Sequence, residues 1–216
     1  MENEKQIVYV EQLSLTIGKE TLLKDINVTF EQGKIYGIIG RNGSGKTLLF
    51  KCICGYIKPT TGHVFVNGKE IHKDIDFPDN TGMIIETPGF IANNSGYMNL
   101  KHLADIRKRI DKKRICESML SVGLDPDNKK PVKKYSLGMR QRLGLAQAIM
   151  EDPILLVLDE PMNGLDNEGV EDMRKYLLHW KSEGKTILLA SHNKEDIQIL
   201  CDVVYEMNKG KLTQIN

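Results

Sequence analysis

The sequence predicts an α/β fold in which a mostly parallel core sheet is joined by an antiparallel β subdomain and an inserted helical subdomain. Three short β-branched or alternating runs with polar breaks predict the antiparallel part, at residues 7–10, 13–17 and 26–30. Apolar runs that alternate with helical patterns predict the parallel core. A charged stretch of helical pattern predicts the insert, over about 88–135. The 216 residues therefore fit one domain, 1–216, with that insert.

Periodicity and turn residues place the other elements along the chain. An apolar run that ends in a glycine-rich loop indicates a strand and then a helix, and Asn67-Gly68 suits a type I′ hairpin turn. In chain order we expect a strand at 35–39, a helix at 46–55, a hairpin strand at 62–66, a turn at 123–126, a helix at 136–150, a strand at 154–158, a helix at 167–182, a strand at 186–191, a helix at 194–201 and a hairpin around 208–210.

Composition indicates a globular protein with almost no net charge. Hydrophobic residues make up 40% and charged residues 27%, and the formal net charge is +1. Basic runs occur at 107–109 and 112–114, and a solvated helix face explains them better than a nucleic-acid patch. We therefore expect no nucleic-acid partner.

The sequence predicts neither a signal peptide nor a membrane span. The first ten residues are charged and lack an apolar core, and no apolar stretch reaches the roughly 18–20 residues that cross a bilayer. If the protein serves a membrane, another chain must provide the membrane part.

The cysteines fit a reducing compartment better than a metal site. Cys52 and Cys54 lie two residues apart without a matching second pair, which makes zinc binding a weak alternative. Buried small hydrophobic side chains are the simpler interpretation.

A phosphate-binding loop follows the strand at 35–39. The pattern G-x-x-x-x-G-K-[ST] is formed by Gly40, Arg41, Asn42, Gly43, Ser44, Gly45, Lys46 and Thr47. Glycines let several backbone N–H groups point at one phosphate, and the helix N-terminus adds positive potential. Lys46 offers a charge to the β- and γ-phosphates of ATP, and Thr47 a hydroxyl to Mg²⁺. This indicates a P-loop nucleotidase with a RecA-like core.

Two carboxylates end the apolar strand at 154–158. Ligands of parallel α/β folds bind at the carboxyl edge of the sheet, where Asp159 and Glu160 are expected. Asp159 is suited to orient Mg²⁺, and Glu160 to align and polarise an attacking water. A buried strand with exposed acids at its end is the alternative, and the phosphate loop makes it the weaker one.

Further motifs resemble the ATP-binding subunits of ABC transporters. The segment from Tyr135 to Arg142 is similar to the signature L-S-G-G-Q-x-Q-R and keeps Ser136 and Gly138. Residues 163–166 look like the D-loop, and Ser191-His192 looks like the H-loop switch. Five motifs occur in the family's order over almost the whole chain. The resemblance implies that Ser136 and Gly138 meet the γ-phosphate held by another copy, and that His192 touches it in its own copy.

The sequence departs from the family's pattern at three places. Ile17 stands where the family stacks adenine on an aromatic ring, so it offers apolar contact without stacking. Glu86 stands for the glutamine of the Q-loop and could ligate Mg²⁺ directly. The Glu-x-Pro-x-Phe pattern there looks like the branch found with lantibiotic-immunity and bacitracin-resistance transporters. Leu137 and Met139 replace a glycine and a glutamine of the signature.

The resemblance implies an ATPase subunit that powers transport, with ATP and Mg²⁺ as cofactors. The expected partners are a separate permease and a second ATPase copy, in an ATP-dependent homodimer or heterodimer. We expect a cytoplasmic protein at the inner face of the cell membrane that exports a substrate such as a peptide antibiotic. One alternative is a soluble ABC ATPase acting on nucleic acid or ribosomes. A nucleotide-gated binding module with little turnover is the other.

Overall fold

A four-stranded antiparallel sheet opens the chain in the computed structural model, which describes residues 6–86 and 89–215. Its order is β2-β1-β4-β5, built from β1 (Gln6–Ile17), β2 (Glu20–Glu31), β4 (Thr61–Val66) and β5 (Lys69–Glu70). Asn67 and Gly68 both have positive φ, as a type I′ turn requires, so the predicted hairpin is confirmed.

The prediction of separate strands at 7–10 and 13–17 was wrong. The two runs form the single strand β1, whose register against β2 shifts between Val10 and Leu13. Gln12 has a φ of 46° inside that interval. The polar break in the sequence is therefore a β-bulge, which bends a strand without ending it. Likewise, the run at 26–30 is only the second half of β2.

A six-stranded sheet forms the core. Its order is β10-β9-β3-β8-β7-β6, and it is parallel except for β10, which runs antiparallel to β9. The strands are β3 (Ile35–Ile39), β6 (Thr81–Ile84), β7 (Leu155–Asp159), β8 (Thr186–Ala190), β9 (Val203–Asn208) and β10 (Lys211–Gln214). The predicted α/β fold with a mostly parallel core sheet is confirmed, although β6 was not predicted as a strand.

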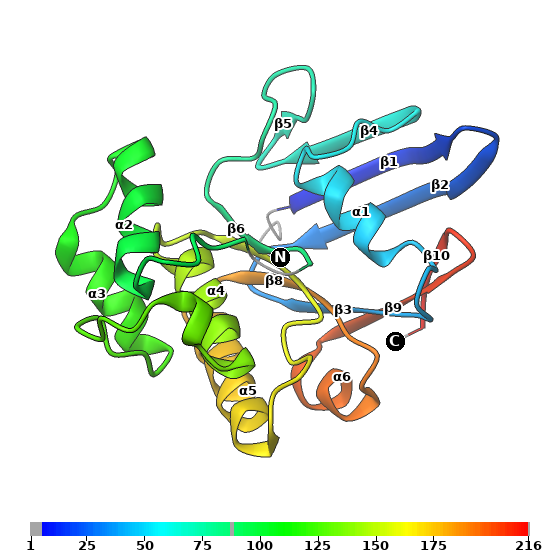
Figure 1. The fold of residues 1–216 in the computed structure, drawn as a ribbon. Coiled ribbons are helices and arrows are strands. Elements are labelled where there is room, and N and C mark those ends of the chain that lie inside the picture. The colour runs from blue at the N-terminus through cyan, green and yellow to red at the C-terminus, as the bar shows by residue number, and fades with distance from the viewer. Residues whose placement is uncertain (1–5, 87–88, 216) are drawn as a thin grey trace.

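Helices cover both faces of the core sheet, as Figure 1 shows. They are α1 (Lys46–Ile53), α2 (Gly96–Arg107), α3 (Lys112–Ser121), α4 (Leu137–Ile149), α5 (Asn167–Ser182) and α6 (Lys194–Leu200), with a short 3₁₀ turn, η1 (Val132–Lys134). α1 lies between the two sheets, and α2 and α3 lie together at the end of the molecule opposite β10. The predicted helical stretch from about 88 begins outside the described residues at Pro88.

Alternating side chains of the buried strands divide the interior into two apolar clusters. In β7, Leu155 and Val157 pack with α1 and the antiparallel sheet, whereas Leu156 and Leu158 pack with α4 and α5. This two-sided burial is what the near-continuous apolar runs predicted. Among the described residues, no helix combines the length and apolarity that a bilayer crossing requires.

Both cysteines of the weak zinc alternative lie in the interior. Cys52 and Cys54 are buried, and burial raises the pKa of each thiol to about 12. Zinc binds the thiolate, so these protonated thiols act as small hydrophobic side chains at neutral pH.

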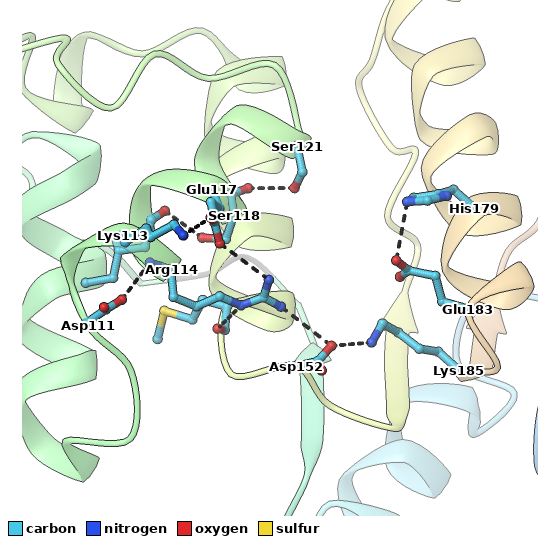
Figure 2. A network of polar contacts seen from close by, with 12 residues as sticks. Asp111, Lys113, Arg114, Glu117, Ser118, Ser121, Asp152, His179, Glu183 and Lys185 are labelled. Atoms are coloured by element: carbon cyan, nitrogen blue, oxygen red, sulfur yellow. Dashed lines mark hydrogen bonds and ion pairs between the residues drawn. The ribbon is translucent and has the colours of Figure 1, made fainter.

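Polar contacts join α3 to the segments that precede the core strands β7 and β8. The Arg114 Nε donates to the Met150 carbonyl at 3.1 Å, and its guanidinium lies 3.5 Å from Asp152 (Figure 2). The Lys185 Nζ donates to the same Asp152 carboxylate at 2.5 Å and keeps the pKa of Asp152 below its ordinary value. Asp152 therefore links α3 to the residues just before β7 and β8.

The contact between β6 and α4 leaves no room for a side chain at Gly82, because an added Cβ would lie 2.0 Å from the Ala148 carbonyl oxygen. We expect Gly82→Ala to push α4 off the sheet and to lower the free energy of unfolding by about 1–3 kcal/mol or more in urea titrations. Gly89→Ala, with nothing within 4 Å of the added carbon, is the matched control and should change stability by less than about 0.5 kcal/mol. Equal stability of the two variants would contradict this packing.

Candidate functional site

The phosphate loop connects β3 to α1 in a conformation that its glycines make accessible. Gly40, Gly43 and Gly45 have φ values of 151°, 78° and 118°. A Cβ on Gly40 would lie 2.3 Å from the Met207 carbonyl oxygen, so the loop is pressed against the end of β9. Its backbone can therefore curl tightly around a small ligand at the start of α1.

Lys46 and Ser44 leave polar groups in this loop that the protein itself does not fully satisfy. The Lys46 side chain is 5% exposed, and its Nζ donates to the Gly40 carbonyl at 2.8 Å. The nearest carboxylate oxygen, Glu160 Oε1, is 3.8 Å away. Ser44 Oγ is buried and has no hydrogen-bond partner among the described residues. A buried cation and an unpaired hydroxyl in a glycine-rich loop fit an anionic ligand such as a polyphosphate.

Thr47 and Asp159 bring two oxygen atoms together beside the loop. The Thr47 hydroxyl donates to Asp159 Oδ2 at 2.5 Å, although the residues are 112 positions apart. Burial raises the pKa of the Asp159 carboxyl, the Thr47 hydrogen bond opposes this, and the Glu160 charge adds to it. A hard cation such as Mg²⁺ prefers this donor set and usually takes further ligands from phosphate. The described residues hold no preformed group of three His, Cys, Asp or Glu ligands.

Glu160 is held between Lys46 and His192. Its backbone N–H donates to the Ala190 carbonyl at 3.0 Å, and its φ is 51°, which is uncommon for a residue other than glycine. His192 Nδ1 lies 2.8 Å from Glu160 Oε2, and Lys46 lies on the side of Oε1. The carboxylate is thus oriented from both sides at the entrance of the loop. Strained backbone of this kind clusters at functional sites.

A cavity of about 600 Å³ contains most of the predicted site residues. All residues from Arg41 to Thr47 line it, together with Glu86, Asp159 and Glu160. Residues that were not predicted as site residues also line it, namely Leu48, Leu137, Arg140, Gln141, Asn163 and Gly164. Its volume falls within the range of small-molecule sites.

Glu86 lines this cavity while its carboxylate binds a lysine. Glu86 Oε1 lies 2.6 Å from the Nζ of Lys51, a residue of α1. The backbone of Glu86 is left-handed, with a φ of 61°. Lys51 was not predicted as a site residue, because it belongs to no motif and lies 35 positions before its partner.

Four predicted site residues do not line the cavity: Ile17, Ser136, Gly138 and His192, the last of which reaches it only through its hydrogen bond to Glu160. Ile17 ends β1 with 54% of its side chain exposed. Ser136 is the N-cap of α4, as predicted, and its Oγ accepts from Met139 N at 3.2 Å. Gly138 lies in the first turn of the same helix, close to Leu165. Within one copy, Ser136 and Gly138 therefore do not line the cavity, although Leu137 between them does.

Gln141 connects α4 to the segment that follows Glu160. Its Nε2 donates to the Pro161 carbonyl at 2.8 Å. The residue was visible within the signature-like segment, but a local pattern gives no direction for its side chain.

Comparisons with known proteins find similar sequences over most of the chain. The family model described as "ABC transporter" matches residues 23–163. An uncharacterized ABC transporter ATP-binding protein of Bacillus subtilis, YybJ, is 47% identical, with 94% of each chain covered. The bacitracin transport ATP-binding protein BcrA of Enterococcus faecalis is 40% identical over 96% of this chain and 68% of that protein. The lantibiotic transport ATP-binding protein SrtF of Streptococcus pyogenes is 36% identical over 94% and 87%.

Solved structures share the fold over the whole length. The structure of cbiO1 from Clostridium perfringens, part of the ABC transporter complex cbiONQ, has a TM-score of 0.85 and 28% identity. The comparison covers 99% of this chain and 89% of that one.

The raised pKa of Asp159 has a consequence for the stability of the ligand-free protein. Because the folded state holds this proton more tightly than the unfolded state, ionisation of Asp159 destabilises the fold as pH rises through the folded pKa. We expect Asp159→Asn to raise Tm at pH 7 without nucleotide or metal by about 2–4 °C, the effect of 1 kcal/mol in a chain of this size. The gain should shrink as pH falls toward 4. Glu20→Gln, at an exposed position of β2, is the control, and a lower Tm for Asp159→Asn would refute the argument.

Proposed function

The chain belongs to the ABC transporter family as its ATP-binding and ATP-hydrolysing subunit, and from this premise we propose which residues perform each step. The supporting observation is the meeting of Lys46, Thr47, Asp159 and Glu160 at one cavity. The phosphate loop and Lys46 bind the β- and γ-phosphates of ATP. Thr47 and Asp159 hold Mg²⁺, with Glu86 within reach of the same cavity. A bound Mg²⁺ would neutralise charge on the phosphate oxygens.

Glu160 acts on the water that attacks the γ-phosphate. His192 hydrogen-bonds to Glu160 Oε2 and leaves Oε1 directed toward Lys46, where the phosphate chain would lie. In that position the carboxylate can orient the water and accept its proton. His192 is proposed to contact the γ-phosphate beside Glu160, to which it is hydrogen-bonded. The pairing predicts that turnover, rather than nucleotide binding, depends on Glu160.

We expect Glu160→Gln to lower the kcat of ATP hydrolysis by about 10²–10⁴-fold, because the amide keeps the shape of the carboxylate and cannot accept the proton. Phosphate release measures turnover, and displacement of a fluorescent ATP analogue should show unchanged affinity. Glu183→Gln is a matched control, because Glu183 contacts His179 at 3.6 Å (Figure 2) and does not line the cavity. If Glu160→Gln still hydrolyses ATP at the wild-type rate, another residue must accept the proton from the attacking water.

Two copies of the ATPase are proposed to share each ATP. Ser136 and Gly138 do not line the cavity of their own copy, whereas Leu137 between them lines it and is also an exposed apolar side chain. A second copy, identical or related, would place its Ser136 and Gly138 on the γ-phosphate. Leu137 and Met139 would then lie in the interface in place of the family's glycine and glutamine. Ile17 would give adenine an apolar surface without ring stacking.

The transported substrate is proposed from the relatives. Proteins named for bacitracin and lantibiotic transport are similar over 94% or more of this chain. A peptide antibiotic, exported through a separate permease at the inner face of the cell membrane, is therefore the proposed cargo. The helices within about 88–135 are proposed to form an inserted subdomain that relays nucleotide state to the permease.

Purification from membranes tests the transport proposal. A tagged Glu160→Gln variant, isolated from detergent-solubilised membranes with ATP and Mg²⁺, should bring a multi-spanning membrane protein in stoichiometric amount. Omission of ATP tests whether recovery of a second ATPase copy depends on nucleotide. Ribosomes or nucleic acid in place of a membrane protein would leave the ATPase standing and would overturn the transport proposal.

A further inference from the structure

We propose that Lys51 is a positioning residue that holds Glu86 away from the Mg²⁺ site, so that the lysine competes with the metal for this carboxylate. The inference rests on the proposed function, because it assumes that Thr47 and Asp159 hold Mg²⁺ beside the phosphates. Lys51, which belongs to none of the sequence motifs, would thereby lower the affinity of the site for a divalent cation.

Helix geometry places Lys51 close to the proposed metal ligands. Lys51 lies four residues after Thr47 in α1, so the two side chains lie on the same face of the helix, one turn apart. The Thr47 hydroxyl faces Asp159, and the Lys51 ammonium binds Glu86 at 2.6 Å. One helix face therefore contacts both the buried carboxylate of β7 and the carboxylate that follows β6.

The charges around the cavity explain why Glu86 needs a partner. Three carboxylates, on Glu86, Asp159 and Glu160, line the same cavity. Like charges that share one cavity repel one another, so the three carboxylates need positive partners. Lys46 lies 3.8 Å from Glu160, and Lys51 binds Glu86. Each lysine thus offsets the charge of one carboxylate when no cation is bound.

The ion pair also fits the backbone at Glu86. A left-handed φ of 61° at a residue other than glycine persists when its surroundings hold it. The Lys51 contact joins this residue to α1, which begins at the phosphate loop. Ligation of a cation beside Thr47 by Glu86 would weaken the Lys51 contact, because two positive charges would then share one carboxylate. The pair is partly exposed, with 64% of Glu86 and 27% of Lys51 accessible, so the competition is modest and reversible.

A double-mutant cycle on the full-length chain separates this competition from the general field of a lysine. The affinity for Mn²⁺ is measured by electron paramagnetic resonance at saturating ADP, for wild type, Lys51→Met, Glu86→Gln and the double variant. We expect Lys51→Met to tighten Mn²⁺ binding by roughly two- to fivefold, the range of an exposed ion pair. In the Glu86→Gln background, Lys51→Met should have no further effect. Lys51→Arg keeps the charge and should retain the wild-type affinity.

Equal tightening in both backgrounds would overturn the proposal, because the lysine would then act through its charge alone. No tightening in either background would overturn it as well. Affinity for ADP in EDTA and Tm are measured on the same preparations, so a misfolded variant is recognised and Lys51→Gln then replaces it. If wild type binds ADP but never Mn²⁺, the proposed metal site itself fails. If Mn²⁺ binds equally to all variants, only the role of Lys51 fails.

Discussion

The parallel alignment of β3, β8, β7 and β6 is the constraint on which the site depends. Parallel strands end at the same edge of a sheet, so residues that follow four different strands are brought side by side. Lys46 follows β3, Glu86 follows β6, Glu160 follows β7 and His192 follows β8. If any of these strands ran in the antiparallel direction, the residue that follows it would lie at the opposite edge of the sheet.

Burial of the core strands stabilises the sheet. It also removes polar and charged groups of the candidate site from water, which is unfavourable when no ligand is bound. β7 is buried along its whole length, so Asp159 is taken out of water together with its strand. Lys46 is equally buried with a carbonyl as its nearest partner, and Ser44 Oγ has none among the described residues. A polyphosphate with its cation would satisfy the lysine, the hydroxyl and the carboxylate at once. The molecule thus holds polar groups that such a ligand would satisfy, at a cost in stability without it.

Local sequence patterns predicted the elements and the residues at strand ends, because both depend on near neighbours. Apolar runs located β3 and β7, and the phosphate loop was evident before its partners were known. Elements that depend on contacts between distant segments were not predicted correctly. The bulge in β1 looked like a break between two strands, and β6 is a short strand whose Gly82 is required by a helix distant in sequence. The partner of Glu86 lies in α1, and a pattern along the chain carries no signal for that pairing.

The helix α4 runs from the candidate site at the carboxyl edge of the core sheet to the ion-pair network at the amino edge. Near its start, Gln141 binds the Pro161 carbonyl beside Glu160, and Leu137 lines the cavity. Just past its end, the Met150 carbonyl accepts from Arg114, within the ion-pair network shown in Figure 2. Between them the helix packs closely on β6, where Gly82 leaves no gap. If the first turn of α4 moves, either the contact between Met150 and Arg114 or the packing against β6 must change as well. Glu86 lies two residues after the end of β6. In this fold, one helix connects Glu86, the proposed metal ligand, to the first turn of α4, the proposed contact surface for a second copy.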